Sequence, residues 1–108
     1  MTIEGAEAAT DYQGDPAIIV TYTWTNNSDS DEMFSVVLSD RCFQNGVQLD
    51  SAVISGMSTD AFKEIKPGAT QTLQKAYELD DSSPVTVEVT ETFTFRDEIL
   101  AEKTFDSI

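Results

Sequence analysis

Carboxylates are the most numerous side chains in this sequence that could bind a metal ion or take part in catalysis. It has 20 Asp and Glu residues against six Lys and Arg, with no His and one Cys, and its formal net charge is −14. Three short acidic runs are candidates for a calcium site, and one of them is Asp11 with Asp15. Ca²⁺ takes about six to eight oxygen ligands, which loops at one end of a domain can supply jointly. The candidate metal ligands are Asp29, Asp31, Glu32, Asp80 and Asp81.

These carboxylates also have a simpler interpretation as solvated turns, because aspartate caps turns with its own side chain and keeps an acidic domain soluble. Residues 29–40 depart from the EF-hand pattern, since Met33 and Phe34 stand where a ligand and the turn glycine belong. A carboxylate pair is also what a glycoside hydrolase uses, although a chain of 108 residues has little room for a substrate cleft. We therefore expect turn chemistry first, with calcium binding and a small carboxylate-dependent hydrolase as alternatives.

No other catalytic machinery is indicated, and we predict that the chain is not an enzyme. The absence of His removes the commonest general base and metal ligand. No Ser lies in a Gly-x-Ser-x-Gly elbow, and no Lys is paired with a Ser by a motif. We therefore assign no catalytic residue, and no cofactor apart from the calcium of the alternative above.

Two short motifs carry further chemistry. Cys42 follows Arg41, and a cationic neighbour would lower the pKa of the thiol and make it reactive. The simpler expectation is that Cys42 is a small apolar residue filling the core, and as the one Cys it cannot form an internal disulfide. Asn26-Asn27-Ser28 matches the N-glycosylation sequon, which we interpret instead as a turn after a strand.

The net charge limits the partners of this chain. Nucleic acid and an anionic membrane surface are both unfavourable partners for a protein with a net charge of −14. No apolar run approaches the roughly 18–20 residues of a membrane span, so we expect no direct membrane insertion by this domain. A protein or a surface glycan remains as the expected partner, with the oligomeric state open.

Aromatic and threonine side chains are the candidates for such a contact. Exposed aromatic rings would stack on sugars, and the ones to consider are Tyr12, Phe34, Phe62 and Tyr77. Core packing is the alternative for all four, and we expect Phe62 to be the buried anchor of a long connection. The threonine-rich faces of residues 17–26 and 85–95 would suit a second protein or a second copy, or simply solvent.

The elements that would position these groups are strands, because apolar and polar residues alternate with period two almost throughout. Lys75 interrupts the apolar face of one such segment. Asn45-Gly46 predicts a tight hairpin, since both residues tolerate a positive φ. The alternation and the turn signals predict seven strands, at about residues 2–10, 17–26, 35–44, 47–51, 70–79, 85–95 and 98–106.

Seven short strands in about 100 residues predict one all-β domain, an immunoglobulin-like β-sandwich without a disulfide. Trp24 is the expected centre of its core, packed by Tyr22, Phe93 and Phe95. Two stretches do not fit the alternation. We expect a short helical turn within residues 29–34, and a long connection without clear periodicity at residues 51–65.

Four segments occur in an order and spacing that resemble a known family. They are residues 17–27 (AIIVTYTWTNN), 43–49 (FQNGVQL), 66–70 (KPGAT) and 77–81 (YELDD). Together they resemble an Ig-like family of domains of unknown function, found near the C-terminus of secreted lipoproteins of Gram-positive bacteria, many of them gut or lactic species. The resemblance covers about residues 10–106.

The resemblance implies a location and a general role. It implies that residues 1–108 form one domain of a longer lipoprotein, extracellular and anchored to the membrane through an N-terminal segment absent from this sequence. The family brings no assigned catalytic residues. We therefore predict a non-catalytic binding or interaction module with an unknown ligand, acting through loops at residues 28–34, 53–63 and 80–84 or through an exposed sheet face. The alternative is a structural spacer with no ligand of its own.

Overall fold

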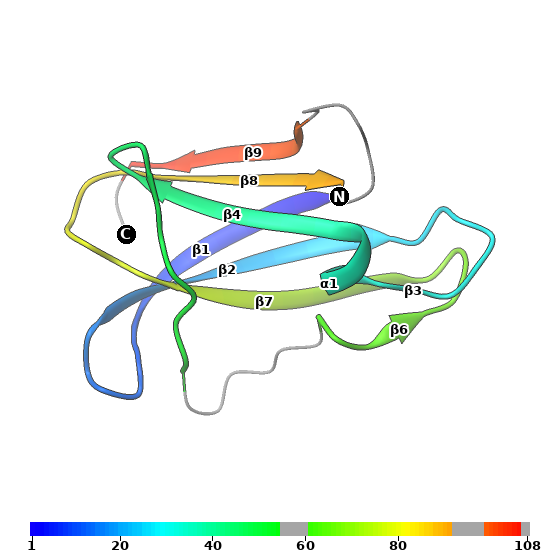
Figure 1. Cartoon of the computed structure of the whole chain (residues 1–108), viewed down its shortest axis with the longest axis horizontal. Helices are drawn as coiled ribbons and strands as arrows, with labels where there is room; N and C mark the ends of the chain where they lie inside the picture. The colour runs from blue at the N-terminus through cyan, green and yellow to red at the C-terminus, as the bar shows by residue number, and fades with distance from the viewer. Residues whose placement is uncertain (55–60, 92–98, 107–108) are drawn as a thin grey trace.

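Two antiparallel sheets contain most of the strands in the residues that the computed structural model describes, which are 1–54, 61–91 and 99–106. One sheet has the order β1-β2-β7, and the other has the order β5-β4-β8-β9 (Figure 1). The first consists of β1 (Thr2–Thr10), β2 (Pro16–Thr25) and β7 (Thr70–Glu78). The second consists of β5 (Val47–Gln48), β4 (Leu38–Gln44), β8 (Val85–Glu91) and β9 (Ile99–Phe105).

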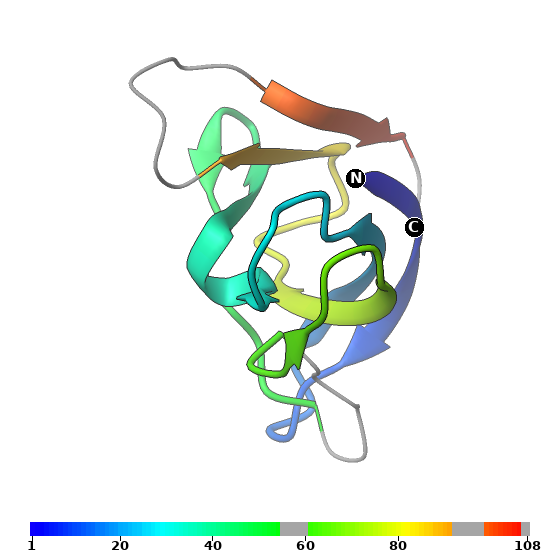
Figure 2. The ribbon, with the colours of Figure 1, turned by 90° about the vertical axis from the view of Figure 1, so that its right-hand side faces the viewer.

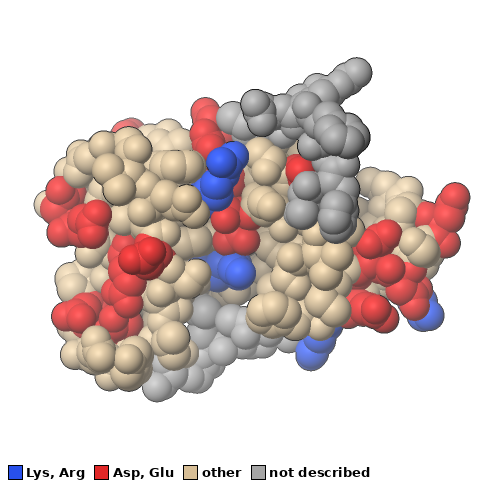
Figure 3. Space-filling model, viewed as in Figure 1, with Lys and Arg blue, Asp and Glu red and all other residues tan. Residues whose placement is uncertain are grey.

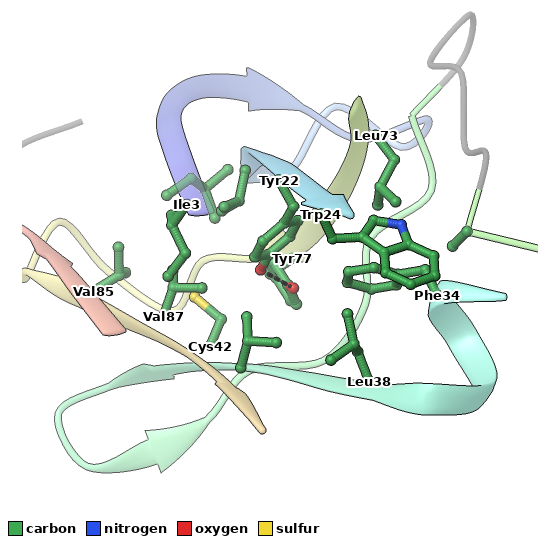
Figure 4. Close-up of a cluster of buried hydrophobic side chains, with 14 of the residues drawn as sticks. Ile3, Tyr22, Trp24, Phe34, Leu38, Cys42, Leu73, Tyr77, Val85 and Val87 are labelled. Atoms are coloured by element: carbon green, nitrogen blue, oxygen red, sulfur yellow. Dashed lines mark hydrogen bonds between the residues drawn. The ribbon is translucent and has the colours of Figure 1, made fainter. Parts of the chain in front are cut away.

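One hydrophobic core lies between the two sheets and receives alternate side chains from both (Figure 4). Trp24 packs edge-on against the ring of Phe34, with 6.2 Å between the ring centroids. Its predicted contacts with Phe93 and Phe95 concern residues outside the described part of the chain, as does the end of the predicted strand 85–95. The buried strand residues of this core are Ile3, Ile18, Val20, Tyr22, Trp24, Leu38, Cys42, Leu73, Tyr77, Val85, Val87 and Val89.

The prediction of an all-β sandwich without a disulfide is confirmed. The end-on view shows β8 and β9 on one side and β2 and β7 on the other (Figure 2). Cys42, the one cysteine, is a free thiol buried in β4. In the described part of the chain, no helix is long and apolar enough to cross a membrane.

The structure corrects the start of the third predicted strand. Its first residues form a single helical turn, α1 (Phe34–Val37), and β4 begins only after this turn. The helical turn expected within residues 29–34 therefore lies later in the chain. In its place β3 (Glu32–Met33) pairs with β6 (Glu64–Ile65). The reason lies in Phe34, whose fully buried ring belongs to the core that α1 helps to close.

The fourth predicted strand, residues 47–51, divides between the two sheets. Its first two residues pair with β4 as β5. The chain then crosses to β7, where the Glu78 N–H donates to the Asp50 carbonyl oxygen at 2.8 Å. The Ala52 N–H donates to the Ala76 carbonyl oxygen at 2.9 Å. The long connection that follows β5 therefore begins as an extra edge segment of the three-stranded sheet, which its lack of periodicity did not predict.

Candidate functional site

The five predicted calcium ligands lie at opposite ends of the sandwich. Asp29, Asp31 and Glu32 lie between β2 and α1, whereas Asp80 and Asp81 follow β7 at the other end (Figure 1). The space-filling view shows acidic side chains gathered at both ends of the molecule (Figure 3). The two runs are therefore apart, and among the described residues no group of three or more His, Cys, Asp or Glu is placed to hold a metal ion. Calcium binding stays a prediction.

Members of both acidic runs accept hydrogen bonds from their own loop or from a neighbouring one. Asp31 accepts a hydrogen bond from Lys66 Nζ at 2.8 Å, and this contact raises the pKa of the Lys66 ammonium. Asp81 accepts a hydrogen bond from the Ser83 backbone N–H at 2.7 Å. Hydrogen bonds from the side chain and backbone of Ser83 lower the pKa of Asp81. These contacts agree with the turn chemistry that was expected first.

A third acidic group, which we call the Asp11 cluster, consists of Asp11, Asp15, Asp50 and Glu78. Asp11 accepts hydrogen bonds from the backbone N–H groups of Asp15 (2.9 Å) and Gln13 (2.8 Å), and the bond from Asp15 is the main cause of its lowered pKa. The hydrogen bond between Glu78 and Asp11 raises the pKa of Glu78, and the charges of Asp15 and Asp50 raise it further. The sequence groups Asp11 with Asp15, and only the fold adds Asp50 and Glu78 from distant parts of the chain.

The four candidate aromatic residues divide into two buried and two exposed. Phe34 is fully buried and Tyr77 is 3% exposed, so both belong to the core. Tyr12 and Phe62 are 64% and 71% exposed. The prediction that Phe62 anchors the long connection is wrong, because the neighbouring Ala61 is the buried residue there.

Tyr12 lies beside a second exposed apolar side chain. The Tyr12 N–H donates to the Val53 carbonyl oxygen at 2.9 Å, and Val53 is 63% exposed. Ile19 and Ile54 are partly buried against a small group of alanines on the outer face of β2 and β7, namely Ala17, Ala52 and Ala76. We call the two exposed residues the Tyr12–Val53 surface. The sequence analysis named Tyr12 and the loop at residues 53–63, but only the fold shows that they meet.

A hollow of about 530 Å³ opens beside Trp24, near β3. Its volume is within the roughly 300–1,000 Å³ of small-molecule sites. Trp24 itself is 5% exposed, packs against Phe34 and donates from Nε1 to Gln71 at 2.9 Å, so its ring is engaged in the fold. The described residues that line the hollow are Met1, Trp24, Thr25, Asn26, Asn27, Ser28, Glu32, Val37, Leu38, Glu91 and Leu100.

Three threonines of the predicted outer faces pair with threonines of the neighbouring strands β7 and β9. Each pair satisfies part of the hydrogen-bonding capacity of its hydroxyl groups, and the rest is open to water. An interface on these faces stays a prediction. The pairs are Thr23 with Thr72 (3.0 Å), Thr25 with Thr70 (2.8 Å) and Thr86 with Thr104 (3.0 Å).

The two short motifs have structural roles. Cys42 faces the core and is 0% exposed, and burial with the nearby charge of Asp40 raises the pKa of its thiol to about 12. A reactive thiol is therefore contradicted. Asn26 of the sequon is 2% exposed, and its Nδ2 donates to the Ser30 and Ile65 carbonyl oxygens at 2.8 and 3.0 Å. The structure thus agrees with a turn at this position.

Comparison with known proteins gives one likeness of fold and one family. A solved structure described as a "putative lipoprotein from Staphylococcus aureus subsp. aureus NCTC 8325" matches with a TM-score of 0.69 and 15% sequence identity. The match covers 97% of this chain and 81% of that one, and at this identity it concerns the fold. Among curated proteins none matches. The family model described as "Domain of unknown function (DUF5067)" matches residues 1–91, most of the chain, and the protein therefore belongs to the DUF5067 family.

Proposed function

We propose that this chain is a non-catalytic interaction module that binds a protein partner through the Tyr12–Val53 surface. The observation that carries the proposal is the exposure of Tyr12 (64%) and Val53 (63%) on two segments joined by a backbone hydrogen bond. Large apolar side chains held on an ordered framework are typical of surfaces that another protein covers. Ala52, the neighbour of Val53 in the chain, is buried against Ala17 and Ala76, which holds this segment on the sheet.

The Asp11 cluster indicates the charge of the partner. Asp11 directly precedes Tyr12 in the chain, and Asp50 lies on the segment that leads to Val53. Carboxylates around an apolar contact attract a partner that carries Lys or Arg beside its own apolar side chains. Salt screens such attraction over about 8–10 Å, so binding should weaken as ionic strength rises.

The comparisons support a setting outside the cell. The fold is shared with a chain described as a "putative lipoprotein", and the resemblance noted in the sequence points to the same class. In this proposal the domain is part of a longer lipoprotein of a Gram-positive bacterium, anchored to the membrane by a lipidated N-terminal segment. A structural spacer remains the alternative role.

The test compares three immobilised forms of the protein for retention of surface proteins extracted from the producing cells. The native chain is compared with a Tyr12→Ser/Val53→Ser double variant and with Val47→Ser. Val47 is the matched control because it is 61% exposed but lies in β5 of the other sheet. We expect one protein to be retained by the native chain and by Val47→Ser, and lost with the double variant and at high salt.

Two outcomes would contradict the proposal. Equal retention by all three forms would place any binding elsewhere on the molecule. Retention by none of them would favour the spacer, provided that circular dichroism shows all three forms to be folded.

A further inference from the structure

Two charged side chains face each other inside the sandwich, at positions where the alternation calls for apolar residues. Lys75 lies between Leu73 and Tyr77 on the inward face of β7, and Asp40 lies on the inward face of β4. Lys75 Nζ is 3.7 Å from Asp40 Oδ1, which joins the two sheets. Their side chains are 23% and 13% exposed. The anomaly at Lys75 in the sequence therefore has a partner across the core.

Their strand neighbours on the inward faces are apolar. Val20 is opposite Lys75 in the pairing of β2 with β7, and Val89 is opposite Asp40 in the pairing of β4 with β8. Both valines are fully buried. The amine and the carboxyl group thus meet beside aliphatic side chains, where separated charges are costly.

A tyrosine pair holds the other oxygen of the Asp40 carboxyl group. The Tyr77 hydroxyl donates to Asp40 Oδ2. It also bonds the Tyr22 hydroxyl at 2.6 Å (Figure 4). Burial raises the pKa of both tyrosines, so both remain protonated donors around neutral pH. Asp40 therefore has Oδ2 fixed by a hydrogen-bond donor, while Oδ1 faces the amine.

The Lys75–Asp40 contact is longer than a good ionic hydrogen bond. Charge-assisted N–H···O bonds are about 2.7–2.9 Å long, against 3.7 Å here. The arrangement instead has the parts of an acyl transfer: an amine beside a carboxyl group, and a donor at the oxygen where negative charge would develop.

We propose that Lys75 and Asp40 condense spontaneously into an amide bond that links β7 to β4. A proton first passes from the ammonium group to Oδ1, which leaves a neutral amine and a carboxylic acid. The Nζ lone pair then attacks Cγ, and the negative charge on Oδ2 is stabilised by the Tyr77 hydroxyl. The Cγ–Oδ1 bond breaks, and Oδ1 leaves as water with two of the three protons that began on Nζ. No oxidant or other reactant is required.

Such a bond would give the sandwich an internal covalent link, which its cysteine content cannot provide. The chain has one Cys, so it cannot close a loop with a disulfide. An amide between positions 40 and 75 would close a loop that includes the whole crossing from one sheet to the other. A covalent link of this kind stabilises a fold by restricting its unfolded chain. This inference stands on the interior of the domain and is independent of the Tyr12–Val53 surface.

The test is the intact mass of the purified native chain, followed by fragmentation of its proteolytic peptides. We expect a mass lower than that of the sequence by one water molecule, and a branched peptide in which Lys75 is joined to Asp40. Lys75→Arg is the matched control. Arg keeps the positive charge but lacks the amine that would form the amide, so this variant should keep its full sequence mass. Tyr77→Phe should form the link about 10²-fold more slowly, as expected for loss of one donor to an oxyanion.

The alternatives are distinguishable by the same measurements. Loss of water in Lys75→Arg as well would indicate dehydration elsewhere, such as succinimide formation at an aspartate, and would overturn the proposal. A native chain that keeps its full sequence mass after prolonged incubation from acidic to alkaline pH would also overturn it and leave an ordinary ion pair. If Lys75→Arg does not fold, the branched peptide of the native chain decides the question alone.

Discussion

The two faces of β2 hold their hydroxyl groups in opposite ways. On the inward face Tyr22 is fully buried, and its hydroxyl bonds the Tyr77 hydroxyl at 2.6 Å. On the outward face the Thr23 hydroxyl bonds Thr72 at 3.0 Å in an exposed position. Both are hydroxyl pairs between β2 and β7. They differ in what the remaining hydroxyl can bond when its partner is removed.

On the outward face, water can replace a lost hydrogen-bond partner. On the inward face, no water is available to do so. A buried polar group that loses its partner incurs its full desolvation penalty, about 1–3 kcal/mol, whereas an exposed group bonds solvent instead. The inward pair therefore specifies how β2 meets β7, and the Tyr77–Asp40 hydrogen bond extends this constraint to the other sheet. The outward pairs leave a surface free to vary or to bind.

The largest expected effect comes from emptying the inward face of β2. Ile18 is fully buried, so Ile18→Ala should lower the free energy of unfolding by about 2–5 kcal/mol, through lost burial and the cavity left behind. The matched control is Thr21→Ala on the outward face, which should change it by about 0.5 kcal/mol or less. Urea unfolding measures both. Losses of similar size would show that the outward face is as tightly packed as the core, against the comparison.

A smaller loss is expected at Asn26, which continues the inward alternation one step beyond β2. Its side chain donates to the Ser30 and Ile65 carbonyl oxygens and accepts from the Ser28 N–H at 3.0 Å. Asn26→Ala should lower the free energy of unfolding by about 1–3 kcal/mol, because these partners lose a buried hydrogen bond. Asn27→Ala, at an exposed neighbouring position, is the control and should have little effect. An equal effect in both would show that the loop, and not the buried amide, supplies the stability.

The long strands could be predicted from the sequence because each is half buried. A strand with one face in the core and one in water must alternate, and the predicted segment 2–10 coincides with β1. The predicted segment 17–26 differs from β2 by one residue at each end, and 70–79 differs from β7 by one residue at its C-terminal end. The two-residue strands β3 and β6 show no period, because two residues are too short to alternate. The helical turn at Phe34 was placed too early for the same reason.

The candidate sites could be predicted only in part, because they depend on which surfaces meet. The anomaly of Lys75 was visible as a charge on an apolar face. Its partner Asp40 lies in the other sheet, and alternation within one strand says nothing about facing residues across a core. Val53 likewise meets Tyr12 because the chain leaves β5 and crosses to β7, a path that turn and strand signals do not encode.

The smallest expected effect concerns the outward side, where one polar group, Glu78, does affect the stability of the fold. The pKa of Glu78 is raised by its hydrogen bond with Asp11 and by the charges of Asp15 and Asp50. A raised carboxyl pKa means that folding favours the protonated form, so the contribution of Glu78 to stability is present at low pH and is lost as pH rises through its pKa in the folded state. At neutral pH the ionised Glu78 therefore opposes folding.

Glu78→Gln removes this charge and keeps an amide that can donate to Asp11. We expect a higher thermal midpoint at pH 7 and a difference that shrinks as pH falls below the ordinary glutamate pKa of 4.5, where Glu78 itself becomes neutral. Glu102→Gln, at an exposed position of β9, controls for the general benefit of reducing a net charge of −14. An equal gain in both variants would assign the effect to overall charge. A gain confined to Glu78 would show that the Asp11 cluster stores repulsion beside the Tyr12–Val53 surface, which a basic partner would relieve on binding.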